Sequence, residues 1–137
     1  MTDYEKQARD FLRKAHARMS ISFLETVEGF PFSNDHYMHD KYIVRIDRAG
    51  KSYRFPFYAS AYDTQRNERP TAYDVLSCVE KWDVGRFVDF VDEYGYELRS
   101  REEFLRVERI WKECGKQYKK LLRLFGPYLM DDLRQIQ

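Results

Sequence analysis

The chain has 137 residues, of which 43% are hydrophobic and 34% are charged, and its formal net charge is +1. This composition excludes a disordered chain and predicts one core in a single domain over residues 1–137. The near-zero net charge offers nucleic acid or an anionic membrane no global field, which disfavours a dedicated nucleic-acid binder. Aromatic residues make up 17% of the chain, so we expect some of them at the surface, where tyrosine serves protein interfaces.

The cysteines and the N-terminus indicate the compartment. Cys78 and Cys114 lie far apart within apolar helical patterns, which is typical of reduced, buried thiols. The N-terminal segment MTDYEKQARD has neither an apolar core nor a cleavage pattern. No apolar run approaches the roughly 20 residues that span a bilayer. We therefore expect a soluble protein of a bacterial or similar cytoplasm that does not bind membranes.

The N-terminal part predicts a helix followed by a strand. Thr2 and Glu5 have the spacing of a capping box, which starts a helix. An apolar stripe with steps of three and four residues follows, and it consists of Ala8, Phe11, Leu12, Ala15 and Met19. From Ser20 an alternation of period two indicates a strand over residues 20–27, although a helical extension also fits.

The segment KYIVRIDRAGKSYRFPFY (41–58) predicts a β-hairpin, with residues 47–50 between two β-rich runs. Pro56 cannot donate a ladder hydrogen bond, so the second strand lies at a sheet edge or ends there. If residues 20–27 also pair, the sheet is a three-stranded antiparallel meander. The polar segment 60–70 then forms a loop. With the helices that precede and follow, the fold class is α+β.

Two short helices are expected after this loop. Thr71 and Asp74 have cap spacing, and the inward face of the first helix consists of Val75, Cys78, Val79 and Trp82. Asp83 is expected to cap the second helix, which Gly95 ends. The inward face of this second helix consists of Phe87, Phe90, Val91 and Tyr94.

The longest helix is expected between a capping box, Ser100 with Glu103, and Gly126-Pro127. Its apolar seam consists of Phe104, Val107, Trp111, Cys114, Tyr118, Leu121 and Phe125. A coiled coil fits this seam, but we favour packing within the chain, because Ile110, Leu122 and Leu124 widen the stripe. The tail from residue 128 is expected to form one turn or a short helix. The C-terminal part is thus a bundle of three to four helices packed on the sheet.

The chain offers little for catalysis or metal binding. In DHYMHD, His36 and His39 lie three residues apart, but zinc needs further ligands that no second Cys or His cluster supplies. Carboxylate pairs fall on predicted solvated helix faces, and no glycine-rich phosphate loop is present. We expect a non-enzymatic protein with no catalytic residues, no metal and no cofactor.

Charge is segregated between neighbouring helices. Residues 72–98 carry seven acidic and two basic side chains, whereas residues 99–125 carry nine basic and four acidic ones. We favour mutual attraction between packed helices as the reason. The functional alternative is a bipolar surface, with an acidic patch that blocks a basic channel or a basic stripe that contacts phosphates.

The segments TAYDVLSCVEKWDVGRFVDFVDEYGYE (71–97) and AGKSYRFPF (49–57) resemble small proteins encoded by phages, prophages and other mobile elements of gut bacteria. The resemblance covers residues 42–125 and includes the YDVL helix start and the YGY helix end. It implies an N-terminal helix and a short antiparallel sheet, and it carries no catalytic motif. The loop at 60–70 is shorter here than in many of those proteins, which removes a surface that they use.

This resemblance implies an accessory protein that binds and inhibits a host defence protein stoichiometrically, such as an anti-CRISPR protein that binds a Cas effector component. We expect the acidic helix pair to occupy a basic channel of that partner through Asp89, Asp92, Glu93 and Tyr96. The alternative is a nucleic-acid-binding accessory protein of a mobile element. It would use the basic residues of the longest helix, Lys112, Lys116, Lys119, Lys120 and Arg123. Surplus aromatics or the heptad seam could also form a homodimer.

Overall fold

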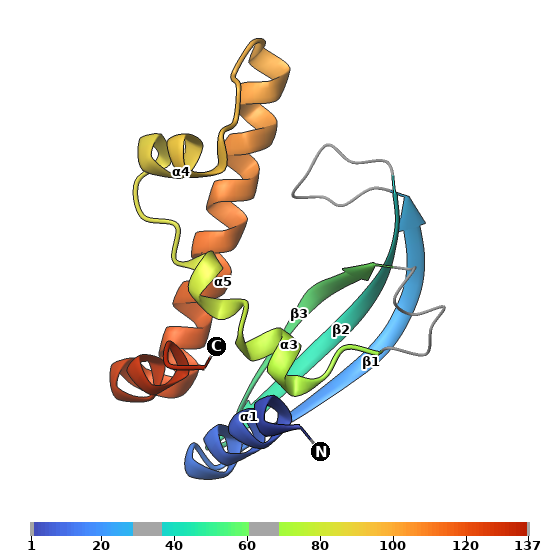
Figure 1. Ribbon diagram of the computed structural model, residues 1–137. Coiled ribbons are helices and arrows are strands. Elements are labelled where there is room, and N and C mark those ends of the chain that lie inside the picture. The colour runs from blue at the N-terminus through green and yellow to red at the C-terminus, as the bar shows by residue number, and fades with distance from the viewer. Residues whose placement is uncertain (1, 29–36, 61–68, 137) are drawn as a thin grey trace.

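The computed structural model describes residues 2–28, 37–60 and 69–136 (Figure 1). The elements in chain order are α1 (Asp3–Lys14), β1 (Ala17–Glu28), β2 (Met38–Arg48), β3 (Lys51–Ser60), α3 (Ala72–Leu76), the 3-10 helix η1 (Val79–Trp82), α4 (Phe87–Tyr94) and α5 (Arg101–Leu133). The three strands form one antiparallel sheet in the order β1-β2-β3. The α+β class and the meander predicted from the sequence are therefore confirmed.

Helix α1 begins at its predicted cap but ends earlier than its apolar stripe suggests. The Thr2 hydroxyl oxygen accepts a hydrogen bond from the Glu5 backbone N–H at 3.1 Å. The helix ends at Lys14, and His16 then adopts a left-handed backbone with a φ of 51°. This turn starts β1 at Ala17, so Met19 packs against the core from a strand. The prediction that the helical stripe includes Met19 was wrong, and the open question over residues 20–27 is resolved as a strand.

The β2–β3 hairpin turns through two residues. Ala49 and Gly50 have φ values of 51° and 76°, and positive φ at both positions matches the twist of a tight hairpin. Pro56 lies opposite Ile43 in β3, which is an edge strand as predicted. One face of the sheet is covered by the helices, and its buried apolar members are Tyr42, Val44, Ile46 and Phe55.

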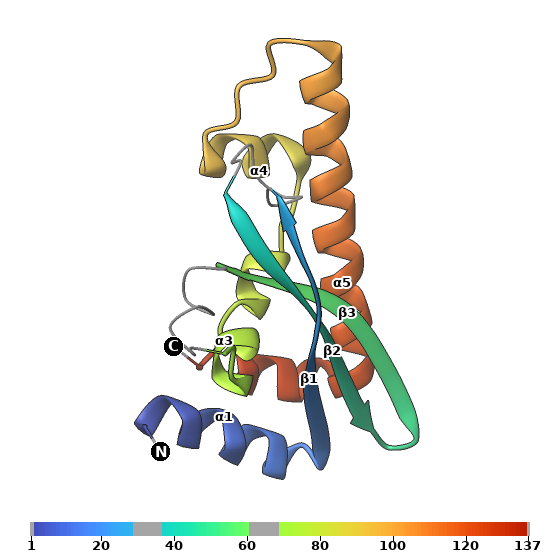
Figure 2. The ribbon, with the colours of Figure 1, turned by 90° about the vertical axis from the view of Figure 1, so that its right-hand side faces the viewer.

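The main core lies between this sheet face, α1, α3, η1 and the C-terminal half of α5. Figures 1 and 2 show α1 and the last segment of α5 at the same end of the molecule. Arg48 connects three of these elements, because it donates to the backbone carbonyls of Ala15 and Leu124, each at 2.8 Å. Lys14 also reaches Asp132 at 2.6 Å, which joins α1 to the end of α5.

A second, smaller cluster joins α4 to the N-terminal half of α5. Its buried members are Phe90, Val107, Ile110 and Cys114, and partly buried aromatics surround them. Most of the α5 seam thus packs within the chain, as we expect from the sequence. Phe104 at its N-terminal end is 39% exposed.

The helix boundaries after residue 70 are partly as predicted. Thr71 and Asp74 form a reciprocal capping box, and Gly95 ends α4 with a φ of 64°. Asp83 does not cap α4, because that helix begins at Phe87 after Arg86. The first predicted helix is divided into α3 and η1. Helix α5 is broken at Gly126, with φ 81° and ψ 160°, and a short helical segment follows.

Candidate functional site

A pocket of about 530 Å³ lies between α5 and the connection from η1 to α4. Its α5 wall is strongly basic and contains Lys112, Lys116, Lys119, Lys120 and Arg123. These are all five residues that the sequence assigns to the nucleic-acid-binding alternative. Asp83 is the one acidic residue among the described residues that line the pocket. Its carboxylate lies 3.6 Å from the guanidinium of Arg134.

The basic wall follows from the helical period. The five cations recur at steps of four, three, one and three residues, which places them along one side of a helix. All five side chains are exposed, while Cys114 and Leu121 on the other side are buried in the two cores. From Lys112 to Arg123 the helix rises roughly 16 Å, at 1.5 Å for each residue. That length corresponds to about five phosphates of one strand in a B-form duplex.

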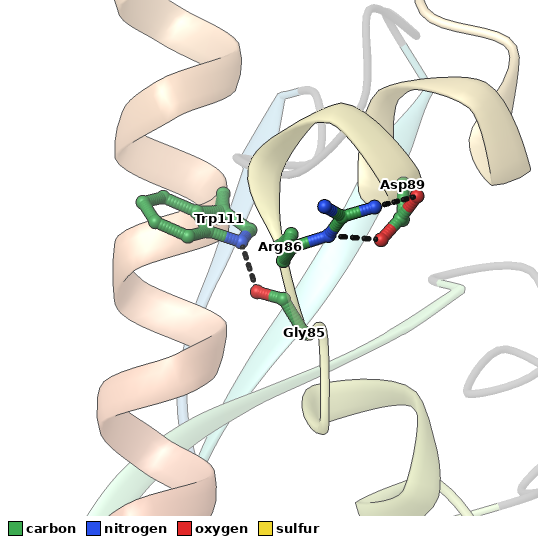
Figure 3. Close-up of polar contacts among 4 residues, drawn as sticks. All are labelled: Gly85, Arg86, Asp89 and Trp111. Atoms are coloured by element: carbon green, nitrogen blue, oxygen red, sulfur yellow. Dashed lines mark hydrogen bonds and ion pairs between the residues drawn. The ribbon is translucent and has the colours of Figure 1, made fainter.

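The aromatic part of the pocket consists of two indole rings and the ring of Tyr118. The Trp111 indole N–H donates to the Gly85 carbonyl oxygen at 2.9 Å (Figure 3), and the ring meets Phe87 edge-on at a centroid distance of 5.5 Å. Trp82 meets Phe55 edge-on at 5.4 Å. Each indole therefore packs against a phenylalanine outside the pocket while it also lines the pocket.

The basic surface continues toward the β2–β3 hairpin. A smaller hollow of about 250 Å³ shares Lys120 and Arg123 with the first pocket and adds Lys51 and Tyr53. The Lys120 ammonium lies 5.1 Å from the centre of the Tyr53 ring, within cation–π range. Burial raises the pKa of Tyr53 to about 12, so the ring is neutral near pH 7. The sequence did not identify Lys51, because no local pattern places this turn beside α5.

The acidic residues predicted as a partner surface occupy α4 and the turn after it. Asp89 forms an ion pair with Arg86, whose Nε–H donates to the Asp89 carboxylate at 2.9 Å (Figure 3). This hydrogen bond lowers the pKa of Asp89. Asp92 and Glu93 are exposed on α4. Tyr96 packs its ring against Phe90 at 5.5 Å, and burial raises the pKa of Tyr96. The structure thus gathers three carboxylates on one short helix, with Tyr96 partly in the adjoining cluster.

No group of three or more His, Cys, Asp and Glu residues within 2–28, 37–60 and 69–136 could hold a metal. The prediction for the DHYMHD segment cannot be placed fully, because His36 lies outside the described residues. Asp40 of this segment is buried, and it accepts a hydrogen bond from Thr26 at 2.6 Å. Burial raises the pKa of the Cys114 thiol to about 11, so this cysteine is a poor nucleophile near neutral pH.

No protein-family model, curated protein or solved structure matches the chain. The resemblance to phage-encoded proteins therefore stays a prediction. Across the described parts of the chain, every helix is too short or too polar to cross a bilayer.

Proposed function

We propose that this protein binds nucleic acid through the basic face of α5. The observation that carries the proposal is the convergence of five exposed cations and two indole rings on one pocket. A helix face of Lys and Arg attracts phosphates and releases their counterions, whatever the net charge of the whole chain. The whole chain is nearly neutral, with 24 Lys and Arg residues against 23 Asp and Glu residues, so the positive field is local to this face of α5.

The arrangement supplies both parts of a nucleic-acid contact. Lysine ammonium groups contact phosphates, and these contacts set the affinity and the position of the ligand without any dependence on base sequence. Aromatic rings give bases a flat apolar surface that tolerates any base. We therefore expect affinity that depends strongly on salt and weakly on sequence.

Two charge-reversal variants of equal net charge test this proposal. Lys116→Glu with Lys119→Glu alters the pocket, whereas Lys6→Glu with Arg9→Glu alters exposed positions of α1. Fluorescence anisotropy with a labelled 12-nucleotide oligomer at low salt should show a loss of at least tenfold for the first pair alone. Equal affinities for the two variants, or no binding by the unaltered protein, would refute the proposal.

A second candidate function is inhibition of a host defence protein, in the host cytoplasm, through the acidic surface of α4. The observation in its favour is that Val88 and Tyr94 are 57% and 47% exposed beside Asp92 and Glu93. Exposed apolar groups among carboxylates suit a protein partner with a basic channel. An anti-CRISPR role with a Cas effector component is the specific form of this proposal.

One affinity purification distinguishes the two functions. Tagged protein is recovered from a lysate with an active CRISPR system, treated with nuclease and washed with high salt. A Cas protein that remains bound, and that is lost on Asp92→Lys with Glu93→Lys, would support inhibition. Capture that disappears with nuclease and salt would leave nucleic-acid binding as the function.

A further inference from the structure

We infer that the pocket beside α5 holds an unstacked base, so that the ligand is single-stranded nucleic acid. This inference rests on the proposed function and specifies its ligand class. Phosphate contacts alone need only the exposed lysines. The pocket and its two indoles provide a feature that a phosphate backbone does not use.

The dimensions and the lining of the pocket suit a base. Its volume of about 530 Å³ falls within the range of sites that hold small organic ligands, roughly 300 to 1,000 Å³. Trp82 comes from η1 and Trp111 from α5, and both line this space. Base stacking on such rings contributes about 1 to 3 kcal/mol for each base and does not depend on sequence.

The indoles are held before any ligand binds. Trp111 is fixed by its hydrogen bond to Gly85 and by Phe87, while Trp82 is fixed by Phe55. A ring that is already ordered loses little conformational entropy when a base stacks on it. This arrangement favours stacking over a purely ionic contact.

The cations lie where the phosphates beside such a base would run. Lys112 follows Trp111 directly in α5, and Lys116, Lys119 and Arg123 continue along the same wall. In a duplex the bases stay paired and stacked, so they cannot enter the pocket without the cost of unpairing. A single strand can place one base in the pocket and its phosphates along the helix.

The experiment compares three probes with the unaltered protein at one salt concentration. The probes are a 10-nucleotide oligothymidine, an abasic oligomer with the same number of phosphates, and a 10-base-pair duplex. We expect the abasic oligomer to bind about 5- to 150-fold more weakly than oligothymidine, as loss of one stacked base predicts. An oligouridine of the same length tests whether RNA binds like DNA, and comparable binding fits the inference because the pocket recognises the base.

Variants add a second readout. Trp111→Leu should lower affinity for oligothymidine but not for the abasic oligomer. Trp111→Phe should retain most of the affinity for oligothymidine, since a ring can still stack. Oligothymidine should also quench tryptophan fluorescence, whereas the abasic oligomer should not. This measurement uses the unaltered protein and so does not depend on the folding of a variant.

The outcomes separate this inference from the proposed function. Equal affinity for oligothymidine, the abasic oligomer and the duplex would overturn the base pocket and leave backbone binding intact. Failure of every probe to bind would overturn both.

Discussion

The indole N–H of Trp111 donates to the carbonyl oxygen of Gly85 at 2.9 Å, across 26 positions in the sequence. This bond joins the middle of α5 to the segment that precedes α4 (Figure 3). It therefore fixes the separation of two walls of the basic pocket. The ring also packs at the edge of the second hydrophobic cluster, so this side chain contributes both to the pocket and to the packing of α4.

The first prediction concerns this hydrogen bond. Trp111→Phe keeps an aromatic ring but removes the donor, and we expect it to lower the free energy of unfolding by about 1 kcal/mol. Urea denaturation measures the change. Tyr128→Phe is the control, because Tyr128 is 80% exposed and its substitution should be nearly neutral. Equal stability of the two variants would show that the bond contributes nothing to folding.

The second prediction concerns Arg48, which holds the carbonyls of Ala15 and Leu124. Arg48→Met leaves both acceptors without this donor, and we expect a loss of about 2 kcal/mol. The matched control is Arg45→Met on the same strand, where the arginine pairs with Asp47 at 2.9 Å at the surface. That control should change the free energy of unfolding by less than about 0.5 kcal/mol. A similar loss in both variants would contradict the role of Arg48.

The third prediction compares two glycines of α5. At Gly126, φ 81° and ψ 160° fall in a region that other residues avoid, so Gly126→Ala should cost about 1 to 3 kcal/mol. At Gly115 the backbone is helical, and an added Cβ would lie 3.6 Å from a Val84 methyl, which is ordinary contact. Gly115→Ala should therefore stabilise the protein by up to about 1 kcal/mol. Thermal unfolding of both variants tests the opposite signs, and a shift of the same sign would refute this account.

The fourth prediction concerns pH. Burial raises the pKa of Cys114 from 9.0 to about 11, so the fold favours the neutral thiol. The resulting stability is complete below about pH 9 and is lost as the pH rises toward 11, because the unfolded chain releases its proton first. Between pH 8 and pH 10, the free energy of unfolding should therefore fall less in Cys114→Ala than in the unaltered protein. An identical fall in both proteins would show that Cys114 does not contribute.

Local chemistry predicted much of the fold. Side-chain oxygens of Thr2, Thr71 and Ser100 each accept a backbone N–H at a predicted helix start, and the hairpin turns where its sequence indicates. The errors concern two helix boundaries. The left-handed residue His16 ends the first helix before its apolar stripe ends. The carboxylate of Asp83 lies near Arg134 of the C-terminal segment instead of capping α4.

The candidate site was predictable only in part. The charge and period of α5 identified its five cations, since a helix places such residues on one side. The sequence assigned Trp82 and Trp111 to inward helix faces, which is correct for their packing but misses their place in the pocket. Lys51 and Tyr53 reach this surface only because the hairpin folds against α5, and no local pattern contains that contact.

The measurement that tests nucleic-acid binding most directly is the dependence of affinity on salt. The logarithm of the association constant for a single-stranded oligomer should fall linearly with the logarithm of salt concentration, with a slope of about −3 to −4 if all five cations contact phosphates. Lys119→Glu should reduce the magnitude of that slope by about one. A slope near zero, or one that Lys119→Glu leaves unchanged, would contradict the proposal that the basic face of α5 binds nucleic acid.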